Sequence, residues 1–318
     1  MSKLIETPAY LNTMSTLGFD LRKDANEVAI ISRQLEYIKA ATYDVEYISS
    51  QWRKFIPPGN DVEAWAQEYG FDAWDRVGRA KIIANYADDL PYVDAFVRRT
   101  RAQIKGLGDA YWYSVDDLRR TAHTGNRLDQ RKAEAARDAI EREMDQVAAV
   151  GNVDYGLVGL LNNPNVAVVT PTAGDWTAAT TAVQIFQDLN KLVNSVLTAS
   201  SQVYKPDTAL LPPSRYAYLT QPAGVNLDRT ILDLFLQTNP YVKNIDQWWY
   251  LETANAAGTG PRIVTYLRDP KILDFTVPLD FTQHAPQPKN LIFHVPCEAK
   301  VGNVNIYRPQ AVAYMDLV

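Results

Sequence analysis

Residues 114–166 read SVDDLRRTAHTGNRLDQRKAEAARDAIEREMDQVAAVGNVDYGLVGLLNNPNV, and this stretch decides the fold. Its middle part places apolar side chains three to five residues apart on one narrow face and crowds charged side chains onto the others. The pattern predicts a helix over 128–150, about 34 Å long at 1.5 Å per residue. Ser114, three residues before Asp117, predicts a capped helix start, whereas Gly125 predicts an interruption and Gly151 the end. The apolar positions of the helix are Leu128, Ala133, Ala136, Ile140, Met144 and Val147.

The composition is that of a folded protein with an acidic balance. With 318 residues, of which 47% are hydrophobic and 22% charged, the chain can build one large domain or two of ordinary size. A formal net charge of -5 argues against a dedicated nucleic-acid reader, although not against a protein that encloses nucleic acid. The single cysteine, Cys297, excludes an internal disulfide. The N-terminus lacks a signal peptide and the chain lacks an 18-residue apolar run, so we expect a cytoplasmic origin and no membrane span.

The rest of the chain mixes helices and short strands without regular alternation, which predicts an α+β fold. Residues 1–24 are typical of an arm, and 28–38 of a short amphipathic helix. After a turn over 52–60, residues 61–89 indicate an extended two-stranded excursion whose return strand lies at 80–83. Because an isolated hairpin is marginally stable in water, this excursion needs another surface to lie on. Further helices are predicted over 177–200 and 226–237, and strands over 96–113, 166–170, 216–219, 248–251, 263–267 and within 291–318.

No constellation of residues in the sequence supports a catalytic or metal site. We therefore predict that the chain is not an enzyme and binds no cofactor. No phosphate-binding loop and no serine-nucleophile motif is present. A basic cluster of Arg98, Arg99, Arg101 and Lys105 fits either phosphate contact or an exposed, ion-paired strand face. The three histidines are scattered and have no cysteine beside them to complete a metal site: His123, His284 and His294.

Residues 156–166, GLVGLLNNPNV, resemble the G-x-x-G-L-L-N-x-P-N-V segment of tailed-phage major capsid proteins. The segment follows directly on a long charged helix, which is where that family has it. Weaker similarities lie in the family's order along the chain, at YADDLPYVD (86–94), YSVDDL (113–118) and VNIYRPQAV (304–312). The resemblance spans residues 30–318 in all.

The resemblance implies the Hong Kong 97-type capsid fold, an α+β fold with an N-arm, an E-loop, a peripheral domain built on a long spine helix, and an axial domain. By order along the chain, we expect the N-terminal arm and short helix at 1–60 and the E-loop at 61–92. The peripheral domain then takes 93–172 plus 276–318, and the axial domain takes 173–275.

The resemblance also implies a function. The chain would be a structural subunit of an icosahedral phage or prophage head, which self-assembles into hexamers and pentamers and encloses double-stranded DNA. Its partners would be other copies of itself, a portal and, where they exist, a separate scaffold or decoration protein; its place would be the virion capsid, assembled in the host bacterial cytoplasm. Two alternatives stay open: the shell subunit of an encapsulin-like protein compartment, and a soluble enzyme with an unrecognised site.

Two sets of residues are expected at these contacts. The first lies in the E-loop and packs on a neighbouring subunit: Trp65, Trp74, Lys81 and Ile82. The second is a basic patch that faces non-specifically packaged DNA: Arg98, Arg99 and Arg101.

Some relatives join an E-loop lysine to an asparagine of another subunit, with a buried carboxylate as the base. Here Lys81 is the only E-loop lysine, and Asn303 or Asn305 would be the acceptor. The reaction needs an amine made neutral by burial, and the neighbours of Lys81 indicate no apolar pocket. No carboxylate lies within four residues of either asparagine. We therefore predict that the subunits are held together non-covalently.

Overall fold

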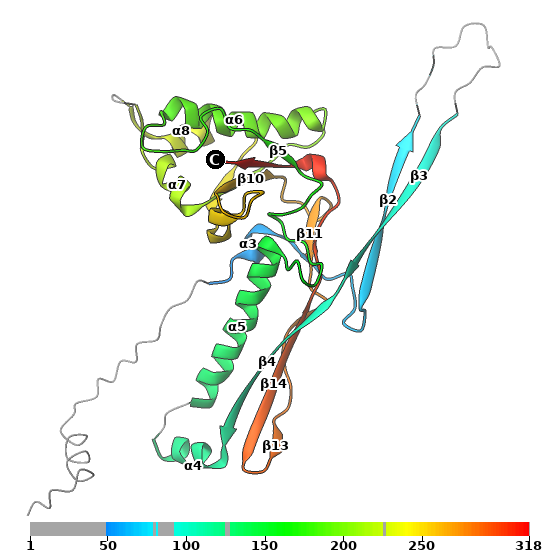
Figure 1. Ribbon diagram of the computed structural model, residues 1–318, viewed down its shortest axis with the longest axis vertical. Coiled ribbons are helices and arrows are strands. Elements are labelled where there is room, and N and C mark those ends of the chain that lie inside the picture. Colours follow the sequence, from blue (N-terminus) through cyan, green and yellow to red (C-terminus); the bar gives the residue numbers. More distant parts are fainter. Residues whose placement is uncertain (1–48, 79–80, 82–91, 125–127, 225–226, 318) are drawn as a thin grey trace, which may run out of the picture. The chain divides into compact units, whose positions relative to one another are not determined.

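The computed structural model describes residues 49–78, 81, 92–124, 128–224 and 227–317 (Figure 1). The chain divides into two units, 1–47 and 48–318, and the described residues belong to the second. The predictions for the arm at 1–24, the helix at 28–38 and Gly125 lie outside the described residues. Within the described residues, helices and strands mix as the α+β prediction requires.

The long predicted helix is confirmed as α5 (Leu128–Val150). It follows α4 (Val115–Thr124), whose start has a reciprocal cap. The Ser114 hydroxyl accepts a hydrogen bond from the Asp117 N–H at 3.0 Å, and the Asp117 carboxylate accepts one from the Ser114 N–H at 3.1 Å. The described part of the apolar stripe on α5 is buried at Ala136, Ile140, Met144 and Val147.

The apolar stripe of α5 packs against a four-stranded antiparallel sheet. β4 (Lys105–Ser114) pairs along its whole length with β14 (Ile292–Val301). The other edge of β14 carries β12 (Leu279–Gln283) and β13 (Gln287–Lys289). Figure 1 shows α5 running beside β4 and β14. Alternate side chains of β14 enter the same core as α5, as the two-residue period of a strand requires: Cys297, Ala299 and Val301.

A second core is built on a five-stranded mixed sheet with the order β5–β16–β10–β6–β9. The helix predicted over 177–200 is α6 (Ala182–Ala199), and its apolar face packs into this core through Ile185, Leu189 and Val193. The strands of the sheet are β5 (Ala167–Val169), β6 (Thr208–Leu211), β9 (Asn244–Gln247), β10 (Arg262–Tyr266) and β16 (Val312–Asp316).

The last strand of the chain pairs with strands from both predicted domains, with β5 from 93–172 and with β10 from 173–275. The predicted division placed 276–318 as a whole in the peripheral domain. β16 instead lies between β5 and β10, parallel to the first and antiparallel to the second. The side chains of Ala313 and Met315 enter the core that α6 covers. The division into peripheral and axial domains stays a prediction, and β16 is the strand that connects the two predicted parts in one sheet.

Residues 52–60, predicted as a turn, contain a short helix and a short strand, α3 (Trp52–Phe55) and β1 (Pro58–Gly59). One carboxylate oxygen of Asp145 on α5 accepts hydrogen bonds from the backbone N–H groups of Gln51 at 3.0 Å and Trp52 at 2.7 Å. Burial raises the pKa of Asp145, and these two hydrogen bonds act in the opposite direction. The spine helix therefore fixes the point at which the chain enters the described fold.

The strand predicted over 216–219 is wrong, because these residues belong to helix α7 (Pro213–Leu219). Pro213 occupies the start of the helix, where its missing N–H has no intrahelical partner and its fixed φ is already helical. The tyrosines of the segment favoured a strand in the sequence. The helix buries Leu219 and leaves Tyr216 and Tyr218 half-buried.

The strand predicted over 248–251 is also wrong, because the chain turns there into a 3₁₀-helix, η1 (Trp249–Thr253). Trp248 and Leu251 are both buried, and their spacing of three residues matches a 3₁₀ turn. Trp249 between them is 57% exposed. Strand propensity alone does not separate this arrangement from a buried strand.

The helix predicted over 226–237 is confirmed but begins later, as α8 (Ile231–Thr238). The Thr230 hydroxyl caps it by accepting a hydrogen bond from the Asp233 N–H at 3.1 Å. The residues before this cap form β8 (Leu227–Thr230), which pairs with β7 (Pro222–Gly224).

The segment 156–166, which carries the family resemblance, folds back over the end of α5. Gly151 adopts a left-handed φ of 69°, and its N–H donates to the Val147 carbonyl. The N–H groups of Leu160 and Leu161 donate to the next two carbonyls, of Ala148 and Ala149, at 2.9 Å each. The fourth carbonyl, of Val150, accepts from the Asn162 side chain. All four carbonyl groups that a helix leaves without intrahelical partners at its end are thus satisfied.

Asn162→Ala is expected to lower the free energy of unfolding by about 1 kcal/mol, because Asn162 also accepts from the Gly159 N–H at 2.9 Å and the substitution removes both hydrogen bonds. Urea unfolding of the unassembled subunit measures the loss. Asn165→Ala is the matched control, since Asn165 is exposed in the same segment. Equal stability of the two variants would contradict the role of Asn162.

Candidate assembly surfaces

The predicted excursion is a hairpin of two antiparallel strands, β2 (Glu68–Val77) and β3 (Asp94–Gln103). The two strands pair with each other and with no other strand in the described parts of the chain. The return strand predicted at 80–83 lies outside the described residues except for Lys81, and the described partner of β2 is β3. The sequence favoured 80–83 for its isoleucines, whereas β3 is largely polar and is fixed by its register with β2.

Apolar side chains of this hairpin lie in solvent. Phe96 is 58% exposed, and Trp65, just before β2, is 79% exposed. Exposed apolar side chains of this kind are typical of surfaces that bind another protein, so the hairpin and the residues before it are candidates for such a contact. Of the predicted interface residues, Trp74 lies in β2 and the exposed Lys81 lies in the link between the strands, whereas Ile82 is outside the described residues. Their contact with a neighbouring subunit stays a prediction.

The three predicted DNA-facing arginines do not share one face of the hairpin. Side chains alternate along β3, so Arg99 and Arg101 project to one face and Arg98 to the other. Arg99 forms a two-pronged ion pair with Asp72, its cross-strand neighbour, at 2.7 and 2.9 Å. These hydrogen bonds lower the pKa of Asp72. The structure therefore gives Arg99 a role within the hairpin, and the DNA-facing role of the patch stays a prediction.

The base of the hairpin contacts a small sheet, β1–β11–β15, formed with β11 (Leu273–Thr276) and β15 (Val304–Ile306). The Tyr69 hydroxyl on β2 donates a hydrogen bond to the Asn305 side-chain oxygen at 2.7 Å. The Phe71 ring lies edge-on to the Tyr307 ring, with 4.8 Å between centroids. Both aromatic residues point the same way because they are two positions apart on one strand.

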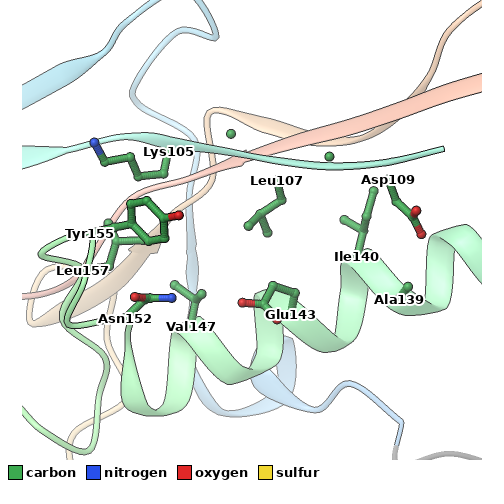
Figure 2. A pocket seen from close by; sticks show the side chains of 12 residues that line it. Lys105, Leu107, Asp109, Ala139, Ile140, Glu143, Val147, Asn152, Tyr155 and Leu157 are labelled. Atoms are coloured by element: carbon green, nitrogen blue, oxygen red, sulfur yellow. The ribbon is translucent and has the colours of Figure 1, made fainter.

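A groove of about 480 Å³ lies between β4 and α5 (Figure 2). Leu107 from the strand and Ile140 and Val147 from the helix line its middle, and Lys105, Asp109 and Glu143 lie around them. Among the residues that line the groove there is no serine, cysteine or histidine. The groove therefore holds no serine–histidine or cysteine–histidine pair of a nucleophilic catalyst.

Metal-binding groups do not gather in the part of the chain that the structure describes. His284 pairs with Glu298 at 3.0 Å on the surface, His294 lies in β14, and the side chain of His123 is outside the description. None of the described helices is long and apolar enough to cross a bilayer.

A comparison with known protein families shows which family the chain belongs to. A family model described as "Major capsid protein" matches residues 78–318. The chain belongs to the major capsid protein family. A comparison with curated proteins finds no match.

Solved capsids share the fold of this major capsid protein. The capsid of Myoviridae phage XM1 aligns with a TM-score of 0.78 at 16% identity, covering 90% of this chain and 98% of that one. The Mycobacterium phage Ogopogo structure gives 0.60 at 15% identity, with the same coverage of 90% and 98%. A virus-like particle from Pyrococcus furiosus gives 0.51 at 15% identity, covering 82% of this chain and 90% of that one.

These comparisons confirm the resemblance drawn from residues 156–166 and the Hong Kong 97-type fold that it implied. The major capsid protein is a structural subunit of a phage head shell, its place is the virion capsid, and it self-associates as capsid proteins do. The compartment-shell alternative is not favoured. The enzyme alternative has no support from the family or from the structural neighbours.

Proposed function

We propose that this chain builds an icosahedral phage or prophage head by joining into hexamers and pentamers around double-stranded DNA. The observation that carries the proposal is the hairpin β2–β3, which exposes apolar side chains and whose strands pair only with each other among the described strands. A two-stranded hairpin is marginally stable in water by itself, so a surface of a neighbouring subunit would stabilise it. We take this hairpin as the E-loop: its first strand, 68–77, lies within the expected bounds of 61–92, and its second strand, 94–103, lies beyond them.

Electron microscopy of particles from cells that express the chain, together with a nuclease-protection assay, tests this proposal. Closed icosahedral shells are expected. In an infected or induced host, these shells should protect double-stranded DNA from nuclease. Shells filled with protein instead would favour a compartment, and the absence of any shell would contradict the proposal.

The other expected partners are proteins that a phage head needs in order to be filled with DNA and closed. A portal, and a separate scaffold or decoration protein where one exists, would bind the assembled shell in the host bacterial cytoplasm. DNA contact would be non-specific, because a chain with a net charge of -5 has local basic residues but no strong positive excess. The packaged DNA should therefore show no sequence preference that depends on Arg98, Arg99 or Arg101.

The subunits are expected to stay separable, so a denaturing gel of mature particles should show one band near 35.7 kDa. The structure brings a carboxylate, Asp274, to 2.9 Å from the Asn305 amide, a proximity that the sequence does not show. Asn305 is nevertheless buried, and its amide already binds Asp274, Thr276 and Tyr69, which leaves no approach for an amine. Asn303 accepts a hydrogen bond from the Val158 N–H.

The control for this prediction is Lys81→Arg, which keeps the charge and removes the nucleophilic amine. The wild type and the variant should give the same single band after boiling with reductant. A ladder of multiples in the wild type that disappears in the variant would show that the prediction is wrong.

A further inference from the structure

We propose that Tyr69 and the buried group that holds it set the direction in which the hairpin leaves the subunit, and so position the hairpin for assembly. The inference rests on the proposed function, in which this hairpin contacts a neighbouring subunit. We call the holding group the hairpin socket. Its members come from β11, from β15 and from the turn between β14 and β15: Asp274, Thr276, Gly302, Asn303 and Asn305.

The socket is organised around a buried carboxylate. Asp274 is 6% exposed and accepts hydrogen bonds from the Asn305 amide at 2.9 Å and the Tyr307 hydroxyl at 3.0 Å. The same amide nitrogen donates to the Thr276 hydroxyl at 2.8 Å. Because both acceptors lie on the nitrogen side of Asn305, the amide oxygen is left facing the hairpin. That oxygen accepts the hydrogen bond from Tyr69 at 2.7 Å.

The socket also has space shaped for the Tyr69 ring. A Cβ atom added to Gly302 would lie 2.9 Å from the Tyr69 ring and 3.2 Å from the Thr276 side chain. Real Cβ contacts are not this short, so the ring occupies the volume that a side chain at 302 would need. The Asn303 N–H donates to the Tyr69 hydroxyl at 3.3 Å, so this oxygen is held from two sides. A tyrosine, rather than a phenylalanine, fits this site because it both donates and accepts.

Because Tyr69 lies near the start of β2, a small tilt at the socket moves the far end of the strand by a large distance. Tyr69 lies at the second residue of β2, and Val77 ends the strand eight residues later, about 26 Å away at 3.3 Å per residue. A tilt of about 10° at Tyr69 therefore moves the end of the strand by about 5 Å. A displacement of that size separates two packed surfaces, because contacts between apolar atoms need about 4 Å or less.

Two single substitutions test the socket from opposite sides. Tyr69→Phe removes one oxygen and keeps the ring, and Gly302→Ala fills the volume that the ring needs. The matched control is Tyr92→Phe, because Tyr92 is 97% exposed just before β3. Nitroxide labels at Thr100→Cys on the hairpin and Glu134→Cys on α5, in a Cys297→Ser background, report the direction of the hairpin in the unassembled subunit by pulsed electron resonance.

Both test variants should broaden the distance distribution between the labels, and Tyr92→Phe should not. Light scattering of unlabelled subunits should show assembly slowed by about fivefold or more in Tyr69→Phe, the factor that one hydrogen bond contributes to an equilibrium. An unchanged distribution in Tyr69→Phe overturns the socket. A broadened distribution with assembly at the wild-type rate overturns its positioning role.

The proposed contact with a neighbouring subunit and the role of the hairpin socket can be refuted independently of each other. If subunits without the hairpin still form shells, the proposed contact with a neighbour is wrong, whatever the distances between the labels show. If Gly302→Ala does not fold, Tyr69→Phe alone decides the inference, since it adds no volume to the core.

Discussion

Subunits whose hairpin is cut back to its base are expected to stay folded and soluble but to form no shells. The truncation that tests this most directly replaces residues 73–98 with Asn-Gly, so that a two-residue turn joins Asp72 to Arg99. These two residues already lie opposite each other, so the Tyr69 contact and the ion pair remain. Deleting residues 62–88, which lie within the excursion predicted at 61–89, would instead remove β2 and leave β3 without a partner.

Circular dichroism of the truncated subunit should match that of the wild type, while size-exclusion chromatography and electron microscopy should show no shells. Substitutions within β3 refine the test. Phe96→Ser should lower shell yield, because it removes an exposed apolar side chain that we assign to the contact. Thr100→Ser, on the same strand, should assemble normally. Shells of normal yield from the truncated subunit would rule out the proposed role of the hairpin.

Arg262→Ala is expected to lower the free energy of unfolding by about 3 kcal/mol, because it leaves the largely buried Asp316 carboxylate without its charged partner. Arg262 joins the two central strands of the five-stranded sheet through a two-pronged pair with Asp316, in which the side chains are 5% and 13% exposed. A third nitrogen of Arg262 donates to the Leu161 carbonyl, and the guanidinium lies 4.6 Å from the centroid of the Tyr314 ring. One side chain thus connects this sheet to the segment that caps α5.

The chain offers a matched control for this substitution. Arg99 makes the same two-pronged contact with Asp72, but on the exposed hairpin. Water and ions screen such a pair, so Arg99→Ala should leave the unfolding midpoint in urea nearly unchanged. Tryptophan fluorescence follows both transitions in the unassembled subunit. An Arg262→Ala midpoint equal to that of Arg99→Ala would refute the stabilising role of the buried pair.

The sequence predicted those parts of the fold whose cause is local. The spine helix was visible because its apolar positions repeat over twenty-three residues, and Gly151, at which it ends, follows it directly in the chain. The segments 216–219 and 248–251 were misassigned because tyrosine and tryptophan favour strands on average, while a proline and a three-residue burial pattern decide the outcome there.

Contacts between residues that are far apart in the chain could not be predicted from the sequence. The segment 156–166 was recognised by resemblance, but its carbonyl groups are held by Arg262 and Tyr314, more than a hundred residues later. The Tyr69 socket joins residues 236 positions apart, and no periodicity marks either partner. The arginines of β3 were grouped because they are neighbours in sequence, whereas a strand sends neighbours to opposite faces.

The place of β16 has a consequence for how the protein is made in the cell. Met315 pairs with Val169 on one side and with Ile263 on the other, so the sheet lacks an inner strand until residues 312–316 are available. A ribosome adding about 5–20 residues per second needs between about 7 and 30 seconds to go from β5 to β16. Once β10 has been made, β5 and β10 have no strand between them for the rest of that time. Chains whose synthesis stops before residue 312 should therefore be degraded by proteases, and only subunits that contain β16 would enter a shell.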